Sequence, residues 1–117
     1  MLYTEILNNN KDFLALYRKG KFTASKNIVI YVRKNNLPIN RLGITAGKKI
    51  GNAVHRNRAK RIIRQAYREN EILMPIGIDI VIVARSAICD AGSQDLSRYL
   101  KKYGIPEINK MLSSFNR

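Results

Sequence analysis

The stretch KKIGNAVHRNRAKRIIRQAYR, residues 48–68, decides how the rest of the chain is interpreted. It contains eight Lys or Arg residues, one His and no acidic residue. Its apolar residues recur at the spacing of a helix that buries one side, which predicts a helix beginning at Gly51-Asn52. The stripe expected to be buried consists of Val54, Ala59, Ile62, Ile63, Ala66 and Tyr67.

The cations of this helix have no acidic partners within it. Like charges three or four residues apart on a helix repel one another. A solvated surface helix usually relieves that repulsion by mixing both signs of charge, so the missing anions are expected to come from a binding partner. A polyanion such as RNA or DNA is the first candidate, and composition alone does not distinguish the two.

The same asymmetry extends over the middle of the chain. The protein has 117 residues, a formal net charge of +14 and a pI of about 10.4. Residues 13–68 contain fifteen Lys or Arg residues and no Asp or Glu. The length and the 45% hydrophobic content predict one folded domain, residues 1–117. The charge favours a nucleic-acid partner, or less often an anionic membrane.

Several classes of protein are excluded or disfavoured. Cys89 is the only cysteine, so an internal disulfide and a metal site of several thiolates are excluded. No apolar run approaches the roughly 20 residues that span a bilayer. The N-terminal residues lack the basic segment and apolar core of a secretory signal. A cytoplasmic protein without a membrane partner is therefore expected.

The remaining pattern predicts a mixed α/β fold. A short amphipathic helix is expected over residues 11–19, with N-cap candidates just before it. Residues 27–34 and 41–47 are predicted strands, antiparallel because their link is short. Residues 78–84, IDIVIVA, are almost wholly apolar, as in an inner strand covered on both faces. Further predicted elements are an arm or short strand at 1–7, a short strand at 21–25, and helices at 93–103 and 107–115 separated by a Gly-Ile-Pro break at 104–106.

The order of these elements is α-β-β-β-α-β-α, with the basic helix between the last two strands. One sheet with helices on one face would bury the aliphatic strands and the apolar stripes of the helices together. The expected fold is therefore an α/β (α+β) two-layer sandwich.

Aromatic residues suggest two different roles. Phe13 and Tyr17 lie four residues apart and share a helix face, and their positions alone favour a role in the core. The alternative is a stacking platform for unpaired bases, since rings beside a basic field bind single strands without sequence preference. Val29, Tyr31 and Arg33 alternate with the apolar side of their strand, so they would line an open sheet face able to hold extended RNA.

No group of residues forms a convincing catalytic centre. His55, the sole histidine, lies among cations, and no carboxylate or nucleophile is near it in sequence. Asp79 is a single acid in an aliphatic strand, whereas a two-metal nuclease site needs several converging oxygens. Cys89 lacks an evident activating partner and is expected to be a small buried residue. A self-sufficient nuclease that uses Asp79 or His55 is therefore disfavoured.

Residues 48–68 closely resemble the signature of the protein component of bacterial ribonuclease P, a family whose basic helix has an Arg-Asn-Arg core preceded by Lys-Lys and Gly-Asn-Ala. KDFLALYRKG resembles the first helix of that family, and RLGITAG and IDIVIVARSA resemble the strands that enter and leave the motif, so the similarity covers residues 11–87. It implies a fold like domain 2 of ribosomal protein S5, with a left-handed β-α-β crossover where general rules favour a right-handed one. It also implies one C-terminal helix where Gly-Ile-Pro predicts a break.

The resemblance further implies a function. Proteins of this family bind a large catalytic RNA that uses Mg²⁺ to remove the 5′ leader of precursor tRNA, so that RNA and precursor tRNA would be the partners. No catalytic residue, metal ligand or organic cofactor would belong to this chain, which is expected to be monomeric when free. The resemblance assigns RNA binding to Lys48, Lys49, Asn52, Arg56, Asn57, Arg58, Lys60, Arg61, Arg64 and Arg68, and a leader-binding cleft between the first helix and the open sheet face to Phe13, Tyr17, Tyr31 and Arg85.

This assignment reverses the interpretation of Phe13 and Tyr17, which are now expected to be packed at one edge and exposed at the other. Contacts with a leader that mature tRNA lacks would favour substrate over product by differential binding. The runner-up function is a non-catalytic RNA-binding protein of the ribosome that shares the fold and the charge.

Overall fold

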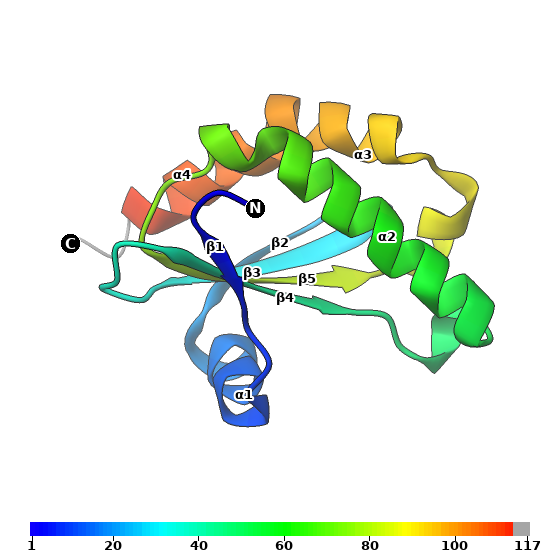
Figure 1. Cartoon of the computed structure of the whole chain (residues 1–117), viewed down its shortest axis with the longest axis horizontal. Helices are drawn as coiled ribbons and strands as arrows, with labels where there is room; N and C mark the ends of the chain where they lie inside the picture. Colours follow the sequence, from blue (N-terminus) through cyan, green and yellow to red (C-terminus); the bar gives the residue numbers. More distant parts are fainter. Residues whose placement is uncertain (114–117) are drawn as a thin grey trace.

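A five-stranded sheet with helices on both faces forms the architecture (Figure 1). The computed structural model describes residues 1–113. The helices are α1 (Asn10–Lys19), α2 (Ala53–Asn70), α3 (Ser93–Tyr99) and α4 (Ile105–Ser113), and the strands are β1 (Thr4–Ile6), β2 (Lys21–Ala24), β3 (Ile28–Lys34), β4 (Asn40–Thr45) and β5 (Ile78–Ala84). The predicted mixed α/β class is confirmed. The expectation that helices cover one face is wrong for α1, which lies on the face opposite α2, α3 and α4.

The strand β5 occupies the centre of the sheet, whose order is β1-β4-β5-β3-β2. It pairs in parallel with β4 and antiparallel with β3. The predicted opposite directions of β3 and β4 are confirmed, but the two strands are not hydrogen-bonded neighbours because β5 lies between them. Every residue of β5 except Val83 is buried, so this strand takes the position that is covered on both faces.

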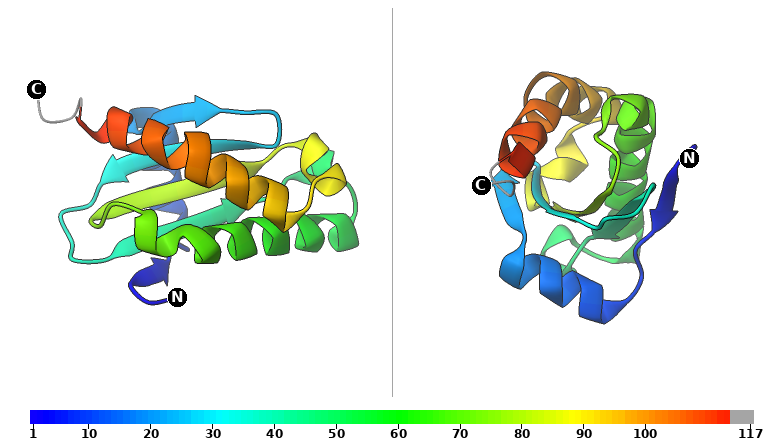
Figure 2. Two further views of the ribbon diagram at one scale, coloured as in Figure 1. Left: turned by 90° about the horizontal axis from the view of Figure 1, so that it is seen from above. Right: turned by 90° about the vertical axis from the view of Figure 1, so that its left-hand side faces the viewer.

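The connection from β4 through α2 to β5 is left-handed. In the right-hand view of Figure 2, the strands β4 and β5 recede from the viewer and the basic helix lies above them. The chain passes from β4 on the right, up through α2, and down to β5 farther left, which is a counterclockwise path. The resemblance predicted this hand, whereas the general rule for parallel units gives the opposite one.

The larger core lies between the sheet and the helices α2, α3 and α4. Ile28, Ile30 and Val32 point into it from β3, and Tyr67 is fully buried on α2. Val54 was expected in the same stripe but is 74% exposed, because the first turn of α2 extends beyond the ends of the strands (Figure 1). Among the helices of residues 1–113, none is long and apolar enough to cross a membrane.

The C-terminal helices continue through the predicted Gly-Ile-Pro break. One π-helical turn, Leu100–Gly104, joins α3 to α4, and the N–H of Ile105 donates to the carbonyl of Leu100 five residues earlier. Pro106 has no N–H to donate, and the widened turn accommodates its ring without ending the helix. The predicted break is therefore wrong. Residues 114 and 115 of the predicted final helix lie outside the described residues.

The first residues form an edge strand that Glu71 holds in place. β1 pairs in parallel with β4. The Glu71 carboxylate, just beyond α2, accepts hydrogen bonds from the N–H groups of Leu2 at 2.8 Å and Tyr3 at 3.3 Å, and from the Thr4 hydroxyl. Burial alone would raise the pKa of Glu71, but these bonds outweigh it and leave the pKa below its ordinary value.

A second buried carboxylate, Asp79, joins α1 to three strands. Arg33 of β3 and Arg41 of β4 are its neighbours in register. Asp79 accepts hydrogen bonds from Arg41 Nη2 at 2.6 Å, Arg41 Nε at 2.7 Å and Arg33 Nε at 3.0 Å. Asn35 Nδ2 donates a further bond at 3.0 Å. Asp12 of α1 accepts from Arg33 Nη2 at 3.2 Å, so the helix is tied to the same group of charges.

We call Asp12, Arg33, Arg41 and Asp79 the ion cluster. Burial opposes the charged form of Asp79, but the bonds from Arg41, Asn35 and Arg33 outweigh that penalty, and the pKa of Asp79 lies below its ordinary value. The carboxylate is fully buried and its oxygens are occupied. Asp79 therefore has a structural role, and a nuclease reaction that uses it is not supported.

Replacing Asp79 with Asn is expected to lower the free energy of unfolding by about 2–4 kcal/mol, because Arg33 and Arg41 would lose the anion that compensates them. Urea denaturation followed by circular dichroism measures the change. Asp90→Asn, at an exposed acid, is the control and is expected to change stability little. Equal stability of the two variants would contradict the role of the ion cluster.

The pH dependence of stability provides a second readout of the same variant. The unfolded state holds the proton of Asp79 more tightly than the folded state, so the stabilisation is complete above the unfolded pKa of about 4 and is lost as the pH falls through the lower folded pKa. Asp79→Asn is therefore expected to show a shallower loss of stability below about pH 4 than the parent protein.

Candidate nucleic-acid interface

Three rows of side chains cross the sheet on the face that carries α1, and the backbone register aligns them. α1 contacts the first row through Asp12 and the second through Phe13 and Tyr17. The third row is half-buried or exposed. The rows are Arg41, Asp79 and Arg33; then Gly43, Val81, Tyr31 and Phe22; then Thr45, Val83, Val29 and Ala24.

Phe13 packs where the sheet has no side chain. A Cβ atom on Gly43 would lie 2.4 Å from Cζ and 2.7 Å from Cε1 of Phe13, so only glycine leaves room for the ring. Leu16 and Val81 are buried beside it in a small core beneath α1. Phe13 is therefore half-buried, with a structural role on its inner side.

Four rings form a continuous aromatic strip, which consists of Phe13, Tyr17, Tyr31 and Phe22. The ring centroids lie 6.5 Å apart for Phe13 and Tyr17, 5.0 Å for Tyr17 and Tyr31, and 5.5 Å for Tyr31 and Phe22. Tyr17 is 40% exposed and Phe22 is 61% exposed, while Phe13 and Tyr31 are half-buried. The core role that sequence position favoured for Tyr17 is therefore incomplete, since its ring contacts Tyr31 and remains open to solvent.

Cations lie beyond the third row. Arg85 is exposed at the end of β5, and its Nη1 donates to the carbonyl of Ser25 at 2.9 Å. Lys48 and Lys49 are exposed in the short turn η1 (Lys48–Ile50), which contacts the turn that follows Arg85. Arg33, expected on the open face, is instead engaged in the ion cluster. The open face of the sheet thus ends at three exposed cations, Arg85, Lys48 and Lys49.

The start of α2 is fixed by Asn52. Its Oδ1 accepts a hydrogen bond from the N–H of His55 at 3.1 Å, so Asn52 is the N-cap of the helix and lies at the Gly51-Asn52 start that the sequence predicted. The same oxygen lies 2.9 Å from Nδ1 of His55. Asn52 therefore fixes the start of the helix, and its side-chain oxygen Oδ1 is already engaged by His55.

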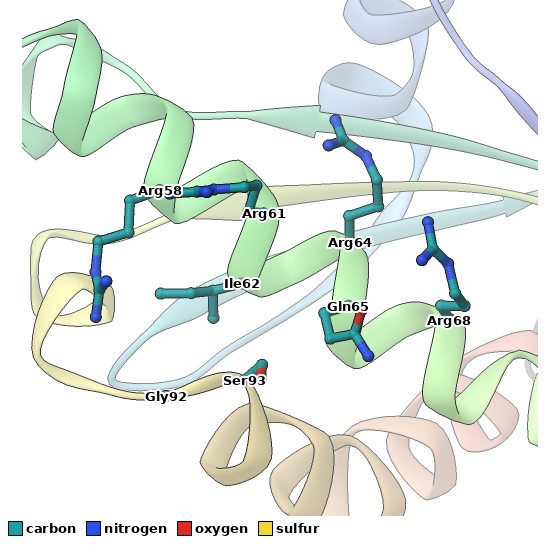
Figure 3. A pocket seen from close by; sticks show the side chains of 8 residues that line it. All are labelled: Arg58, Arg61, Ile62, Arg64, Gln65, Arg68, Gly92 and Ser93. Carbon is teal, nitrogen blue, oxygen red and sulfur yellow. The ribbon is translucent and has the colours of Figure 1, made fainter.

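Four arginines border a groove of about 550 Å³ along α2. In Figure 3, Arg64 and Arg68 point in the same direction, while Arg58 reaches toward the loop before α3. Gln65 and Ile62 line the floor and face Ser93. From Arg58 to Arg68 the helix rises about 15 Å. The full lining is Arg58, Arg61, Ile62, Arg64, Gln65, Arg68, Gly92 and Ser93.

The other residues of the motif differ in access. Asn57 is exposed, whereas Arg56 and Lys60 are half-buried. Arg56 Nε is buried and has no hydrogen-bond partner among residues 1–113. Lys60 lies with Arg64 beside a second groove, between β1 and α2. Within the part of the chain that the structure describes, no Lys or Arg of α2 forms an ion pair, so its charge is unneutralised.

Comparison with known proteins decides the family. Residues 1–104 match the family described as Ribonuclease P. A ribonuclease P protein component from Lachnoclostridium phytofermentans is 42% identical over 111 residues, 95% of this chain and 94% of that protein. Another, from Clostridioides difficile, is 42% identical over 100 residues, 84% of this chain and 87% of that protein. The chain belongs to the ribonuclease P protein family.

Solved structures of ribonuclease P proteins share the fold. The protein from Staphylococcus aureus superposes with a TM-score of 0.76 at 31% identity, covering 92% of this chain and 96% of that one. The protein from Thermotoga maritima gives a TM-score of 0.64 at 31% identity, covering 95% and 94%. The resemblance seen in residues 11–87 is therefore confirmed. The family match extends it in both directions, to residues 1–104.

The two predicted sets of site residues lie mainly on different faces. Most of the RNA-binding set follows η1 and α2, and most of the leader set follows α1 and the opposite face of the sheet. The sets meet where η1 contacts the turn after Arg85, and in the second groove, which Phe13 lines together with Lys60 and Arg64. Sequence reasoning missed Phe22, which lies beside Tyr31 only because β2 and β3 pair in that register. The sequence does indicate a strand at this position, because Phe22 and Ala24 alternate with Lys21 and Thr23. That alternation does not show which strand is the partner, so it does not place Phe22 beside Tyr31.

Gly43→Ala tests how the sheet positions Phe13. The added Cβ would overlap the ring, so the variant is expected to lose about 1–3 kcal/mol of stability in urea denaturation. In a Phe13→Leu background the same substitution should cost less, because the ring is gone. Gly47→Ala is the control, since nothing lies within 4 Å of a Cβ there. Additive costs of Gly43→Ala and Phe13→Leu would refute the contact.

Proposed function

We propose that this chain is the RNA-binding protein subunit of ribonuclease P and that, together with a catalytic RNA, it removes the 5′ leader of precursor tRNA. Family membership supports a role in an endoribonuclease complex that processes tRNA. One observation carries the finer proposal. The same small protein has an arginine groove without acidic partners and a strip of accessible aromatic rings.

The arginine groove supports an anchoring role for α2. Arginine presents a planar fork of donors that matches two phosphate oxygens at once. The groove contains four such side chains and its lining contains no acidic residue, so an incoming phosphate backbone meets no repulsion there. Lys48, Lys49 and Asn57 extend this cationic and polar surface toward the start of the helix. We assign it to the catalytic RNA.

The aromatic strip supports a role in binding the leader. Unpaired bases stack on accessible rings, and each stacked base contributes about 1–3 kcal/mol without sequence preference. Precursor tRNA has a single-stranded leader that mature tRNA lacks. Contacts made only by the leader favour the substrate over the product, which keeps product from occupying the enzyme.

Hydrolysis is assigned to the RNA partner. Among residues 1–113, no group of three or more His, Cys, Asp or Glu side chains is placed to hold a metal ion. Asp79 and Asp12 are engaged in the ion cluster. We therefore propose that the Mg²⁺ required by the complex is bound mainly by RNA, and no step is assigned to a metal on this chain. What this chain contributes is binding and charge neutralisation.

Arg58→Ala is expected to weaken binding to the catalytic RNA and to reduce the slope of log K against log salt by about one unit, because one phosphate contact is lost. Filter binding or fluorescence titration over a range of salt concentrations measures both effects. Arg98→Ala, at an exposed residue of α3 outside the groove, is the matched control. An unchanged slope in Arg58→Ala would argue against a phosphate contact.

Tyr17→Ala is expected to weaken binding of precursor tRNA to the reconstituted complex by about 1–3 kcal/mol while affecting mature tRNA much less. Cleavage assays with the protein alone, with the RNA alone at low Mg²⁺, and with both accompany the binding measurement. Equal losses for precursor and mature tRNA would refute the leader role. Cleavage by the protein alone, or no stimulation of the RNA, would overturn the proposed function itself.

A further inference from the structure

The aromatic strip continues past the residues that the resemblance assigns to the leader. Phe22 lies opposite Tyr31 in register, with ring centroids 5.5 Å apart and planes inclined by 34°. It is 61% exposed and sits on β2, an edge strand of the sheet. An exposed aromatic on an edge strand adds little to the core and promotes unwanted pairing with other chains. Stability of the fold alone therefore does not account for this ring.

We propose that Phe22 is a further leader-binding residue, which stacks on a nucleotide farther from the cleavage site than those held by Phe13 and Tyr17. This inference rests on the proposed function. Phe22 adds a contact at the β2 edge, so the four rings of the strip would bind a longer segment of the leader than the other three rings alone.

The order of contacts follows from the rows of the sheet. Gly43, beneath Phe13, and Phe22 lie on β4 and β2 of the same row, three strand spacings or about 14 Å apart. The helix α2 lies over the β4 side of the sheet (Figure 2). A leader that leaves an RNA anchored on α2 would therefore meet Phe13 first and Phe22 last.

The surroundings of Phe22 suit a nucleic acid rather than a protein partner. Arg18 and Lys19 end α1 immediately before β2, and both are exposed. Lys26 is exposed in the turn that leads from β2 to β3, and Arg85 is bonded to that turn. No acidic residue occurs between residues 13 and 68. Rings interleaved with cations are the surface on which single strands bind.

The test uses the complex reconstituted with its catalytic RNA and a series of precursor tRNAs whose leaders are lengthened one nucleotide at a time. Affinity of the parent complex is expected to rise with leader length to a plateau. Phe22→Ala should reach its plateau at a shorter leader and lie about fivefold or more below the parent for longer ones. Tyr17→Ala should already lose affinity at short leaders. Phe22→Tyr, which keeps the ring, should restore the parent curve.

Tyr103→Ala is the matched control, since Tyr103 is 57% exposed and lies in the π-helical turn on the opposite face. Superimposed curves for Phe22→Ala and the parent protein would overturn the inference, as would an equal loss for mature tRNA. If Tyr17→Ala still shows leader-dependent loss in that case, the proposed function stands and only the role of Phe22 falls. If neither variant depends on leader length, the proposed function falls as well.

Discussion

Arg33 and Arg41, on the two strands that flank β5, converge on the buried carboxylate of Asp79. Asp12 brings α1 to the same group of charges. Buried ion pairs often add little net stability, because desolvation offsets the attraction. Their geometry is nevertheless demanding, since each donor must meet its acceptor at short range. The ion cluster therefore fixes where α1 lies on the sheet. The positions of Phe13 and Tyr17, one turn apart on that helix, follow from it.

The register of the sheet completes what the ion cluster begins. Gly43 provides the space for Phe13, and Tyr31 provides the contact for Tyr17, both from the row adjacent to Asp79. One face of the sheet thus becomes a surface of rings, while the other is filled by the core beneath α2. The sheet lies between the helix α1 on one face and the basic helix α2 on the other.

Much of this arrangement could be predicted from sequence, because periodicity and charge are local properties. The helix α2, the inner strand β5 and the acid-free cationic face all follow from residues close together in the chain. The sheet order could not be predicted, since the placement of β5 between β3 and β4 depends on burial rather than on loop length. Asp79 shows the same limit: its two arginines lie 38 and 46 residues away and meet it only through strand pairing. The π-helical turn at Leu100–Gly104 was hidden because glycine and proline normally end a helix.

The distribution of charge also has a kinetic consequence. Asp12 and Asp79 are paired with Arg33 and Arg41, so these two acids offset little of the field that α2 projects into solvent. A protein with one strongly positive side turns that side toward a polyanion while the two are still separated by about a Debye length. Under the proposed function, this charge asymmetry would orient the encounter with RNA before any contact forms. The arginine groove would meet the RNA first, and the ring-bearing face would stay open for the leader.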